Sequence, residues 1–335
     1  MKKVLATILA LVMVLGVTTI SWATEGGTES GAVAEMGGTN YDDLHTALEA
    51  AKNGGTVKLL GDVNLTTSDW TPVGTSSEPF KGTFDGNGYT ITGLKITSGS
   101  YIGLFGYVGE GATIKNVNLV GASVSGESRV GALIGRIVGD ATVSNCSVDS
   151  ASKVVGDGSN TGGLIGEAIG NITVNLDHLT NHAAVGNKAD ANSRAAGIIA
   201  QVTRGANVTI SNCENRGSIT TNLGYAGGIV AAKQGGSEVS FKNCSNAGTL
   251  TGNYTGSLIA WLVGGNWLSM ANSGDARTAI GAVNISGNEG YTFYFTMDGE
   301  EYYIRKQGDT EGSDTQFSAP VSYTHLRAHE TRGNL

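Results

Sequence analysis

The carboxylates and histidines that could act in acid–base catalysis or bind a metal are scattered along this sequence. Enzymes that cleave polysaccharides need two convergent carboxylates, or carboxylates that hold calcium near a basic residue. Asp42-Asp43 is an adjacent pair, but it lies in the first turn of a predicted helix, where negative charge suits the helix dipole. Four further aspartates fall at different phases of the repeat described below and predict no shared site: Asp149, Asp157, Asp177 and Asp190.

Two histidines, His178 and His182, have the four-residue spacing that brings two metal ligands together on a helix. The residues around them predict a strand and a turn instead. We therefore interpret both histidines as replacements, in a divergent repeat, for residues that lie on the surface or in a column of stacked side chains. The segment Asp85-Gly86-Asn87-Gly88 could pass for a calcium loop, but it lacks the other ligands of an EF-hand and is better explained as a tight turn. No His-Glu-x-x-His motif occurs. The sequence therefore predicts no catalytic residue, no cofactor site and no metal site.

The charge balance narrows the class of partner. The chain has 21 Lys and Arg against 29 Asp and Glu, a formal net charge of −8. An acidic chain is a poor partner for nucleic acid or an anionic membrane. The candidate partners are a host glycan, a host protein or a cell-wall polysaccharide.

A short core motif, small–apolar–apolar–small, recurs six times. Its second residues are separated by 29, 31, 34, 31 and 29 positions, and such a near-constant period is typical of a solenoid. The six copies are Gly103-Leu104-Phe105-Gly106, Ala132-Leu133-Ile134-Gly135, Gly163-Leu164-Ile165-Gly166, Gly197-Ile198-Ile199-Ala200, Gly228-Ile229-Val230-Ala231 and Ser257-Leu258-Ile259-Ala260.

Two further elements follow each core at a fixed phase. The second places an Asn beside Cys or Val, as in Val143-Ser144-Asn145-Cys146, and the third is a run such as Gly217-Ser218-Ile219-Thr220. Short alternating runs bounded by Gly, Asn, Ser and Asp are typical of strands. Three strands per repeat predict a parallel β-helix, in which a coil completes its core only by stacking on its neighbours.

The repeats align two columns of residues. The first mixes Cys with aliphatic residues and is therefore expected to face inward, where a free thiol behaves as a small hydrophobe: Val117, Cys146, Leu179, Cys213 and Cys244. Cys213 and Cys244 fall on adjacent coils, so a disulfide between them is the alternative to buried thiols. The second column consists of amides, which we expect to bond along a ladder of stacked side chains: Asn116, Asn145, Asn212 and Asn243, with His178 in the divergent copy.

Each end of the predicted solenoid has a candidate cap. Residues 41–52 place four apolar side chains at helical spacing ahead of Gly54-Gly55, which predicts a short helix that covers exposed strand edges. Near the other end, Tyr291–Met297 and Glu300–Lys306 flank Asp298-Gly299, which predicts a hairpin. Aromatic residues of this region, with Trp261 and Trp267 among them, either close off the last coil or stack on sugars.

Both chain ends are expected to lie outside the folded module. Lys2-Lys3, the apolar run 4–20 and the exit Ser21-Trp22-Ala23 predict a Sec-type signal peptide cleaved after Ala23. Residues 320–335 match no repeat and read like a translated sequencing adapter. We therefore expect the genuine C-terminus, with any anchoring signal, to be missing.

Three features of the chain resemble the GLUG-motif repeats of bacterial surface proteins: Trp70-Thr71-Pro72-Val73-Gly74, the run Phe84–Ile91, and the Gly-Leu-Phe-Gly and Gly-Leu-Ile-Gly cores. Such repeats also occur in the N-terminal region of immunoglobulin-A-cleaving metallopeptidases. The resemblance extends from about residue 62 to residue 265. It implies an all-β, right-handed parallel β-helix like that of pectate lyase, secreted or displayed at a bacterial surface, with no catalytic residue in the repeats. Two features depart from the pattern: the last three cores end in Ala, and the third copy lacks the Asn-Cys pair.

The expected function is that of a non-catalytic, extracellular repeat module, which acts as an adhesin, a stalk or a display scaffold. The alternative is the accessory N-terminal part of a truncated extracellular enzyme, either a polysaccharide lyase or hydrolase or an immunoglobulin-A-type metallopeptidase. Nucleic acid and membrane insertion after signal cleavage are not expected. The predicted segments are a signal peptide (1–23), a flexible linker (24–39), the capping helix and first strand (40–61), the β-helix (62–281), a hairpin cap or the start of a truncated domain (282–319) and the adapter-like tail (320–335).

Overall fold

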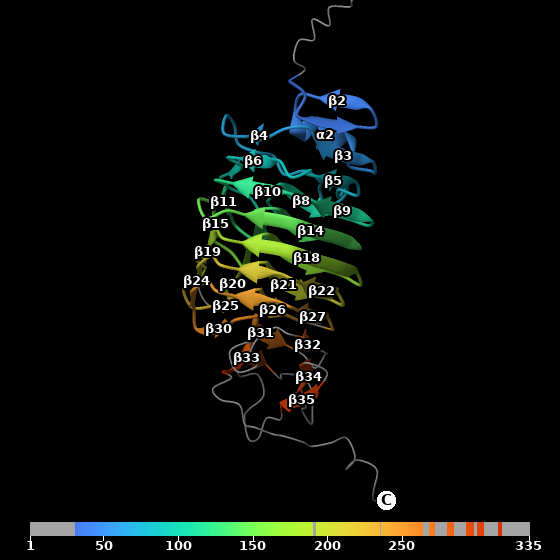
Figure 1. Cartoon of the computed structure of the whole chain (residues 1–335). Helices are drawn as coiled ribbons and strands as arrows, with labels where there is room; N and C mark the ends of the chain where they lie inside the picture. Colours follow the sequence, from blue (N-terminus) through green and yellow to red (C-terminus); the bar gives the residue numbers. More distant parts are fainter. Residues whose placement is uncertain are drawn as a thin grey trace, which may run out of the picture. The chain divides into compact units, whose positions relative to one another are not determined.

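The computed structural model describes residues 31–189, 192–234 and 236–263, and the backbone of five further strands between residues 268 and 316. Within these residues the chain winds through four largely parallel sheets about seven times, and its helical part is α2 (Leu44–Ala50) (Figure 1). The prediction of an all-β solenoid with a short N-terminal helix is thereby confirmed. The predicted signal peptide and the adapter-like tail lie outside the described residues.

Strands of the described residues form sheets of 17, six, five and eight members. The 17-stranded sheet contains β1 (Ala34–Met36), β2 (Thr39–Tyr41), β3 (Thr56–Leu59), β4 (Val63–Asn64), β5 (Thr83–Asp85), β6 (Thr90–Thr92), β9 (Ala112–Lys115), β10 (Asn118–Val120), β14 (Ala141–Val148), β18 (Thr173–Asn181), β22 (Asn207–Ser211), β23 (Glu214–Asn215), β27 (Glu238–Lys242), β28 (Ser245–Asn246), β32 (Leu268–Ala271), β34 (Phe293–Met297) and β35 (Glu300–Ile304). The six-stranded sheet contains β7 (Lys95–Ile96), β11 (Ser123–Gly126), β15 (Lys153–Gly156), β19 (Ala184–Asn187), β24 (Ile219–Thr221) and β29 (Leu250–Thr251).

The two remaining sheets meet at the core motif. The five-stranded sheet contains β12 (Val130–Gly131), β16 (Asn160–Gly162), β20 (Arg194–Ala196), β25 (Tyr225–Gly227) and β30 (Tyr254–Gly256). The eight-stranded sheet contains β8 (Phe105–Val108), β13 (Ile134–Ile137), β17 (Ile165–Ile169), β21 (Ile199–Thr203), β26 (Val230–Lys233), β31 (Ile259–Val263), β33 (Ile280–Asn284) and β36 (Asp314–Gln316). A coil passes through all four sheets, as β13, β14, β15 and β16 do before β17 begins the next.

The repeat therefore has four strands, and the prediction of three strands was wrong. The additional strand has only two or three residues and ends at the bend before the core motif, as β16 does at Gly162. A strand this short, with Gly in it, carries too little alternation of apolar and polar residues to be recognised from the sequence.

The register of the eight-stranded sheet confirms the alignment of the six core motifs. Successive parallel pairs place one residue of each motif in a single column: Phe105, Ile134, Ile165, Ile199, Val230 and Ile259. Every member of this column is fully buried. Apolar side chains from successive coils therefore complete a continuous core, which no single coil could form alone.

One inward position breaks the apolar pattern. Lys233 pairs in register with Val202 on one side and Leu262 on the other, and its side chain is fully buried. Its Nζ atom has no hydrogen-bond partner among the described residues. Burial disfavours the charged form and lowers the pKa of Lys233 to about 8. The sequence analysis did not single out this residue.

The N-terminal cap includes a helix and two strands. Asp43 is the N-cap of α2, and its carboxylate accepts a hydrogen bond of 2.7 Å from the backbone of Thr46. The helix is thus shorter than the predicted 41–52, and the acidic pair precedes its first turn. Antiparallel pairing joins β1 to β2 and β3. The prediction of a flexible linker as far as residue 39 is wrong for its last part, which contains β1.

The predicted hairpin is present as β34 and β35, which pair antiparallel from Phe293–Ile304 to Met297–Glu300. β34 also pairs in parallel with β32, and β33 pairs in parallel with β31. Parallel pairing between coils therefore continues through the hairpin's first strand. The predicted turn at Asp298-Gly299 and Trp267 lie outside the described residues, as do the side chains of the hairpin.

A ladder of buried asparagines links three successive coils in the 17-stranded sheet. The Asn181 amide donates to the side chain of Asn215 at 2.8 Å, and that of Asn215 donates to Asn246 at 2.6 Å. Each amide also donates to the backbone carbonyl two residues later, at Ala183, Gly217 and Gly248. Asn181 and Asn215 are fully buried. These hydrogen bonds satisfy polar groups that would otherwise destabilise the interior.

Replacing the central member of this ladder should destabilise the whole stack. Asn215→Ala removes one hydrogen-bond partner from the amide of each neighbouring coil and leaves the buried Gly217 carbonyl without this donor, so we expect a loss of roughly 2–4 kcal/mol in the free energy of unfolding. Asn222→Ala, which removes an exposed amide bonded to the Lys188 carbonyl, is the control and should lose less than about 1 kcal/mol. Urea denaturation followed by circular dichroism measures both, and equal losses would contradict the role of the ladder.

Candidate functional site

The described aspartates that were considered for catalysis and set aside in the sequence analysis make separate contacts in the structure. Asp149 bonds to Ser152 and to the backbone of Gly121, whereas Asp157 pairs with Lys188 at 3.4 Å. Asp190 lies outside the described residues. Among the residues that the structure describes, no group of three or more His, Cys, Asp or Glu side chains could hold a metal ion.

The candidate calcium loop is an Asx turn. The Asp85 carboxylate accepts hydrogen bonds from the backbone of Asn87 at 2.8 Å and from the side chain of Asn116 at 2.9 Å, and it pairs with Lys115 at 3.3 Å. Asn87 and Gly88 have positive φ angles of 54° and 82°. Protein donors thus already occupy this carboxylate, as expected of a tight turn between β5 and β6.

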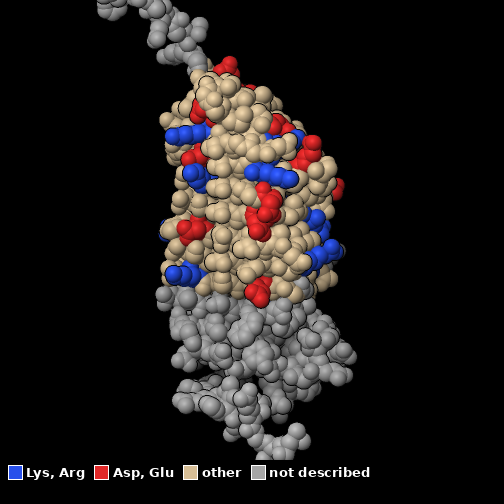
Figure 2. Space-filling view, turned by 90° about the vertical axis from the view of Figure 1, so that its right-hand side faces the viewer, with Lys and Arg blue, Asp and Glu red and all other residues tan. Residues whose placement is uncertain are grey.

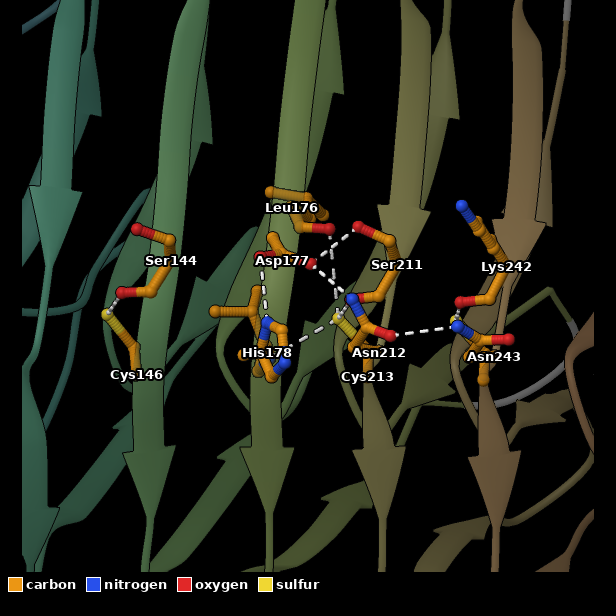
Figure 3. Close-up of polar contacts among 12 residues, drawn as sticks. Ser144, Cys146, Leu176, Asp177, His178, Ser211, Asn212, Cys213, Lys242 and Asn243 are labelled. Atoms are coloured by element: carbon orange, nitrogen blue, oxygen red, sulfur yellow. Dashed lines mark hydrogen bonds and ion pairs between the residues drawn. The ribbon is translucent and has the colours of Figure 1, made fainter.

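The predicted asparagine column lies where the strands of the 17-stranded sheet bend (Figure 3). Every member, His178 included, has a left-handed backbone with φ between 51° and 57°: Asn116, Asn145, His178, Asn212 and Asn243. Asn is among the few residues that adopt this conformation readily. The expected amide ladder is formed at one step, from Asn243 to Asn212 at 3.0 Å, whereas Asn212 and Asn116 donate to aspartates of the preceding coil. Backbone conformation, more than amide stacking, explains the column.

Asp177 is the centre of the polar cluster in Figure 3. Its carboxylate accepts hydrogen bonds from Ser211 at 2.6 Å and Asn212 at 2.8 Å, and pairs with Nδ1 of His178 at 2.7 Å. Burial raises the pKa of Asp177, but these three partners outweigh burial and lower it to about 2. His182 follows the end of β18 and donates its backbone N–H to Val148. His178 thus lies in a strand and His182 after it, so their four-residue spacing does not place them on one face of a helix.

The cysteine column faces the interior, as predicted. Val117, Cys146, Leu179, Cys213 and Cys244 are all at most 2% exposed, and no disulfide joins the three cysteines. Burial raises the pKa of Cys146 to about 12. A hydrogen bond with Cys244, together with burial, raises the pKa of Cys213. Cys146 and Cys213 are therefore poor nucleophiles at neutral pH, because the reactive thiolate is scarce.

A second surface, which the sequence analysis missed, lies where the five-stranded sheet meets the eight-stranded sheet. One residue per coil forms a first row along the five-stranded sheet: Tyr101, Arg129, Asn160, Arg194, Tyr225 and Tyr254. A second row runs along the eight-stranded sheet: Tyr107, Arg136, Glu167, Gln201, Ala232 and Trp261. Each second-row residue stands three positions after the Leu or Ile of its core motif, so the sequence period could have revealed this row.

The two rows contact each other between successive coils. Arg136 lies 4.5 Å from the ring of Tyr101, and the rings of Tyr225 and Trp261 stack at 4.6 Å. The Asn160 amide donates to Gln201. We call this meeting line of the two rows the corner.

Five residues at one end of the corner form a charged and aromatic cluster. Glu167 is 2% exposed and pairs with both Arg136 and Arg129, the latter at 3.4 Å. Tyr101 and Tyr107 lie 5.1 Å apart and are tilted by 31°. Burial raises the pKa of Tyr107. We call these five residues the arginine cluster.

The backbone of the corner explains why the second and third core motifs end in Gly. Tyr101 and Arg129 have φ angles of 61° and 54°, unusual values for bulky residues. A Cβ atom at Gly135 would lie 2.3 Å from Tyr101, and one at Gly166 would lie 2.6 Å from Arg129. Asn160, which aligns with them in the next coil, is not left-handed, and the motif beside it ends in Ala200. In these two motifs the terminal Gly therefore accompanies a left-handed residue in the first row of the preceding coil.

Comparison with known proteins found sequence relatives over short stretches and a solved structure that supports the fold. No protein-family model matches the chain. A 103-residue stretch is 39% identical to a protein described as "Putative Gly-rich membrane protein" from Evansella cellulosilytica, and covers 28% of this chain and 12% of that protein. A 75-residue stretch is 39% identical to halomucin of Haloquadratum walsbyi, and covers 21% of this chain and 1% of halomucin. The chain thus spans a small part of the curated relatives that it matches.

A solved structure shares the fold. The crystal structure of a "putative immunoglobulin A1 protease" from Bacteroides ovatus superimposes with a TM-score of 0.56 at 20% identity, over 78% of this chain and 75% of that one. At this identity the likeness concerns the fold alone. Among the described residues, no helix is long and apolar enough to span a membrane.

The hydrogen bonds of Asp177 should make stability depend on pH in the acidic range. Above about pH 4 the carboxylate is charged in both states, so its stabilising bonds are fully present; as the pH falls from about 4 to about 2, the unfolded state binds the proton first and stability is lost. Asp177→Asn should therefore lower the thermal midpoint at pH 7 and differ little from the wild type at pH 2. Asp157→Asn, which removes an exposed carboxylate, is the control and should shift the midpoint less at pH 7.

The three cysteines should react with a thiol reagent only after unfolding. Burial of all three side chains and the raised pKa of Cys146 predict negligible modification of the native protein by DTNB at pH 8. The denatured, unreduced protein should release three equivalents. One equivalent would instead mean that Cys213 and Cys244 form a disulfide.

Proposed function

We propose that this chain is a non-catalytic repeat module of a secreted or cell-surface protein, where it acts as an adhesin, a stalk or a display scaffold. The supporting observation is where its polar side chains are directed. Asp85, Asp177 and the Asn181–Asn215–Asn246 ladder bond to neighbouring coils. Side chains committed in this way hold coils in register, whereas catalysis needs groups that converge on a substrate.

An extracellular location is supported by the sequence relatives and by two predictions from the sequence. The relatives matched in sequence include halomucin and a protein described as a membrane protein. The predicted signal peptide and the resemblance to GLUG-motif repeats point the same way. Membership of the GLUG repeats is part of this proposal, because it depends on the core motifs and their period.

The second candidate function is that of an accessory part of an extracellular enzyme. It is favoured by one observation, the fold likeness to the Bacteroides ovatus protein. Both candidates give the solenoid a non-catalytic role, and they differ in whether a catalytic domain is attached to it. The alternative would extend to a polysaccharide lyase or hydrolase, or to an immunoglobulin-A-type peptidase.

The proposal predicts that the purified chain cleaves none of the substrates that solenoid enzymes of these classes would attack. Incubation with pectin, with alginate and with immunoglobulin A should produce no new reducing ends, no unsaturated ends and no antibody fragments above a buffer blank. A commercial pectate lyase and an immunoglobulin A protease serve as positive controls. New ends or fragments in the presence of the chain would contradict the non-catalytic assignment.

A further inference from the structure

We propose that the arginine cluster of the corner binds a carboxylate-bearing glycan, such as a uronate-containing polysaccharide. This inference rests on the proposed function of an extracellular module and names its partner. Four of its residues, Tyr101, Tyr107, Arg129 and Arg136, would contact the glycan, and the fifth, Glu167, would hold the two guanidinium groups in place.

The charges of the cluster favour an anionic ligand. Two guanidinium groups share one carboxylate, so the cluster has one positive charge more than it has negative charges. Glu167 is 2% exposed and faces both arginines, whereas the Arg129 side chain is 29% exposed. A buried carboxylate that fixes an arginine leaves its remaining N–H groups in a set direction, and the planar fork of Arg matches a carboxylate.

Arg136 has hydrogen-bonding capacity that the described residues do not use. One of its terminal nitrogens pairs with Glu167, but its Nε atom is buried and without a hydrogen-bond partner. Its guanidinium lies 4.5 Å from the centre of the Tyr101 ring. Glu167 alone therefore does not satisfy this guanidinium, whose side chain is 16% exposed.

The tyrosines supply the surface on which a sugar ring packs. Tyr101 and Tyr107 lie 5.1 Å apart, and both are partly exposed. Tyr combines an apolar ring with a hydroxyl at its edge, which suits the mixed apolar and polar faces of a pyranose. The rows run from coil to coil, about 4.8 Å per step, so an extended polymer lying along them would pass from the tyrosines to the arginines.

Two members of the arginine cluster, Tyr101 and Arg129, have a strained backbone. A left-handed backbone at a bulky residue is strained and tends to occur at binding or active sites. Elsewhere in this chain a recurring left-handed position is filled mostly by Asn. At the corner the chain instead retains Tyr101 and Arg129, and Gly135 and Gly166 make room for them. The choice of Tyr and Arg is thus explained by their side chains and not by the backbone.

Polyphosphates and nucleic acids fit this surface less well. Binding them requires a stripe of many basic residues, whereas the chain has a net charge of −8. On the face shown in Figure 2, Lys and Arg side chains are few and interspersed with Asp and Glu. The arginine cluster has one excess positive charge beside the rings of Tyr101 and Tyr107, which suits a sugar that carries one carboxylate.

Binding of a defined oligogalacturonate tests the proposal. Isothermal titration calorimetry at low salt should detect binding of the free acid, and binding of the methyl-esterified oligomer should be weaker by about tenfold or more, because the ester removes the charge and keeps the ring. Arg129→Asn and Tyr101→Asn should each weaken binding of the free acid by about fivefold or more. Both variants introduce a residue that tolerates the left-handed backbone.

Arg204→Asn is the matched control. Arg204 is also left-handed, with a φ of 56°, and is exposed in a turn away from the corner. The same substitution there should leave binding of the free acid unchanged. Thermal unfolding checks that all three variants fold, and the ester comparison, which uses the wild-type chain, decides the question if they do not.

Three outcomes would overturn the inference: no binding of the free acid, equal binding of acid and ester, or equal binding by Arg129→Asn and the wild type. The length of the oligomer after the titration distinguishes a failure of the glycan proposal from a failure of the proposed non-catalytic function. Shortened oligomers would show catalysis and contradict the non-catalytic assignment, whatever the affinity. An intact oligomer that does not bind would remove the glycan proposal and leave the scaffold proposal standing.

Discussion

Parallel strands in this chain find their hydrogen-bonding partners in the coils before and after them, and this requirement governs most other features of the structure. β14 pairs with β9 and β10 on one side and with β18 on the other. A coil taken alone would leave these backbone groups without partners. Stacking in register then gives equivalent positions the same surroundings. Ile165, Ile199 and Val230 are thus similar residues in one column because each must fill the same part of the core.

The same register limits which polar groups can be buried. An amide side chain has both donors and an acceptor, so one Asn can bond to the identical residue of the next coil, as Asn181 and Asn215 do. A carboxylate only accepts and an ammonium only donates, so neither can form a ladder of identical side chains. Glu167 accordingly has two arginines around it, whereas Lys233 is held with a lowered pKa in an apolar column.

Features that depend on apolar spacing could be predicted from the sequence, and features that depend on backbone conformation could not. The core motifs and the inward cysteine column were predicted because a period of about 30 residues survives substitution of one apolar residue by another. The fourth strand escaped recognition because it is too short for a pattern. The column of Asn116 and Asn212 was noticed, but its left-handed backbone was not, since Asn suits both amide ladders and positive φ. His178 was correctly placed in that column despite its different chemistry.

The residue types in the corner rows could not be predicted, although the period gives the positions of the second row, because the members of a row share a position and not a type. Inward columns must keep volume and polarity nearly constant, and this leaves a repeated signal; outward rows are free of that constraint and vary from Tyr to Arg to Asn. Where two sheets meet, however, outward residues of successive coils contact each other, as Arg129 contacts Glu167. Substitutions of outward residues in a single coil can therefore alter the surface of a solenoid without disturbing its core. Such a surface extends along the stack, which suits recognition of extended polymers better than chemistry at a single bond.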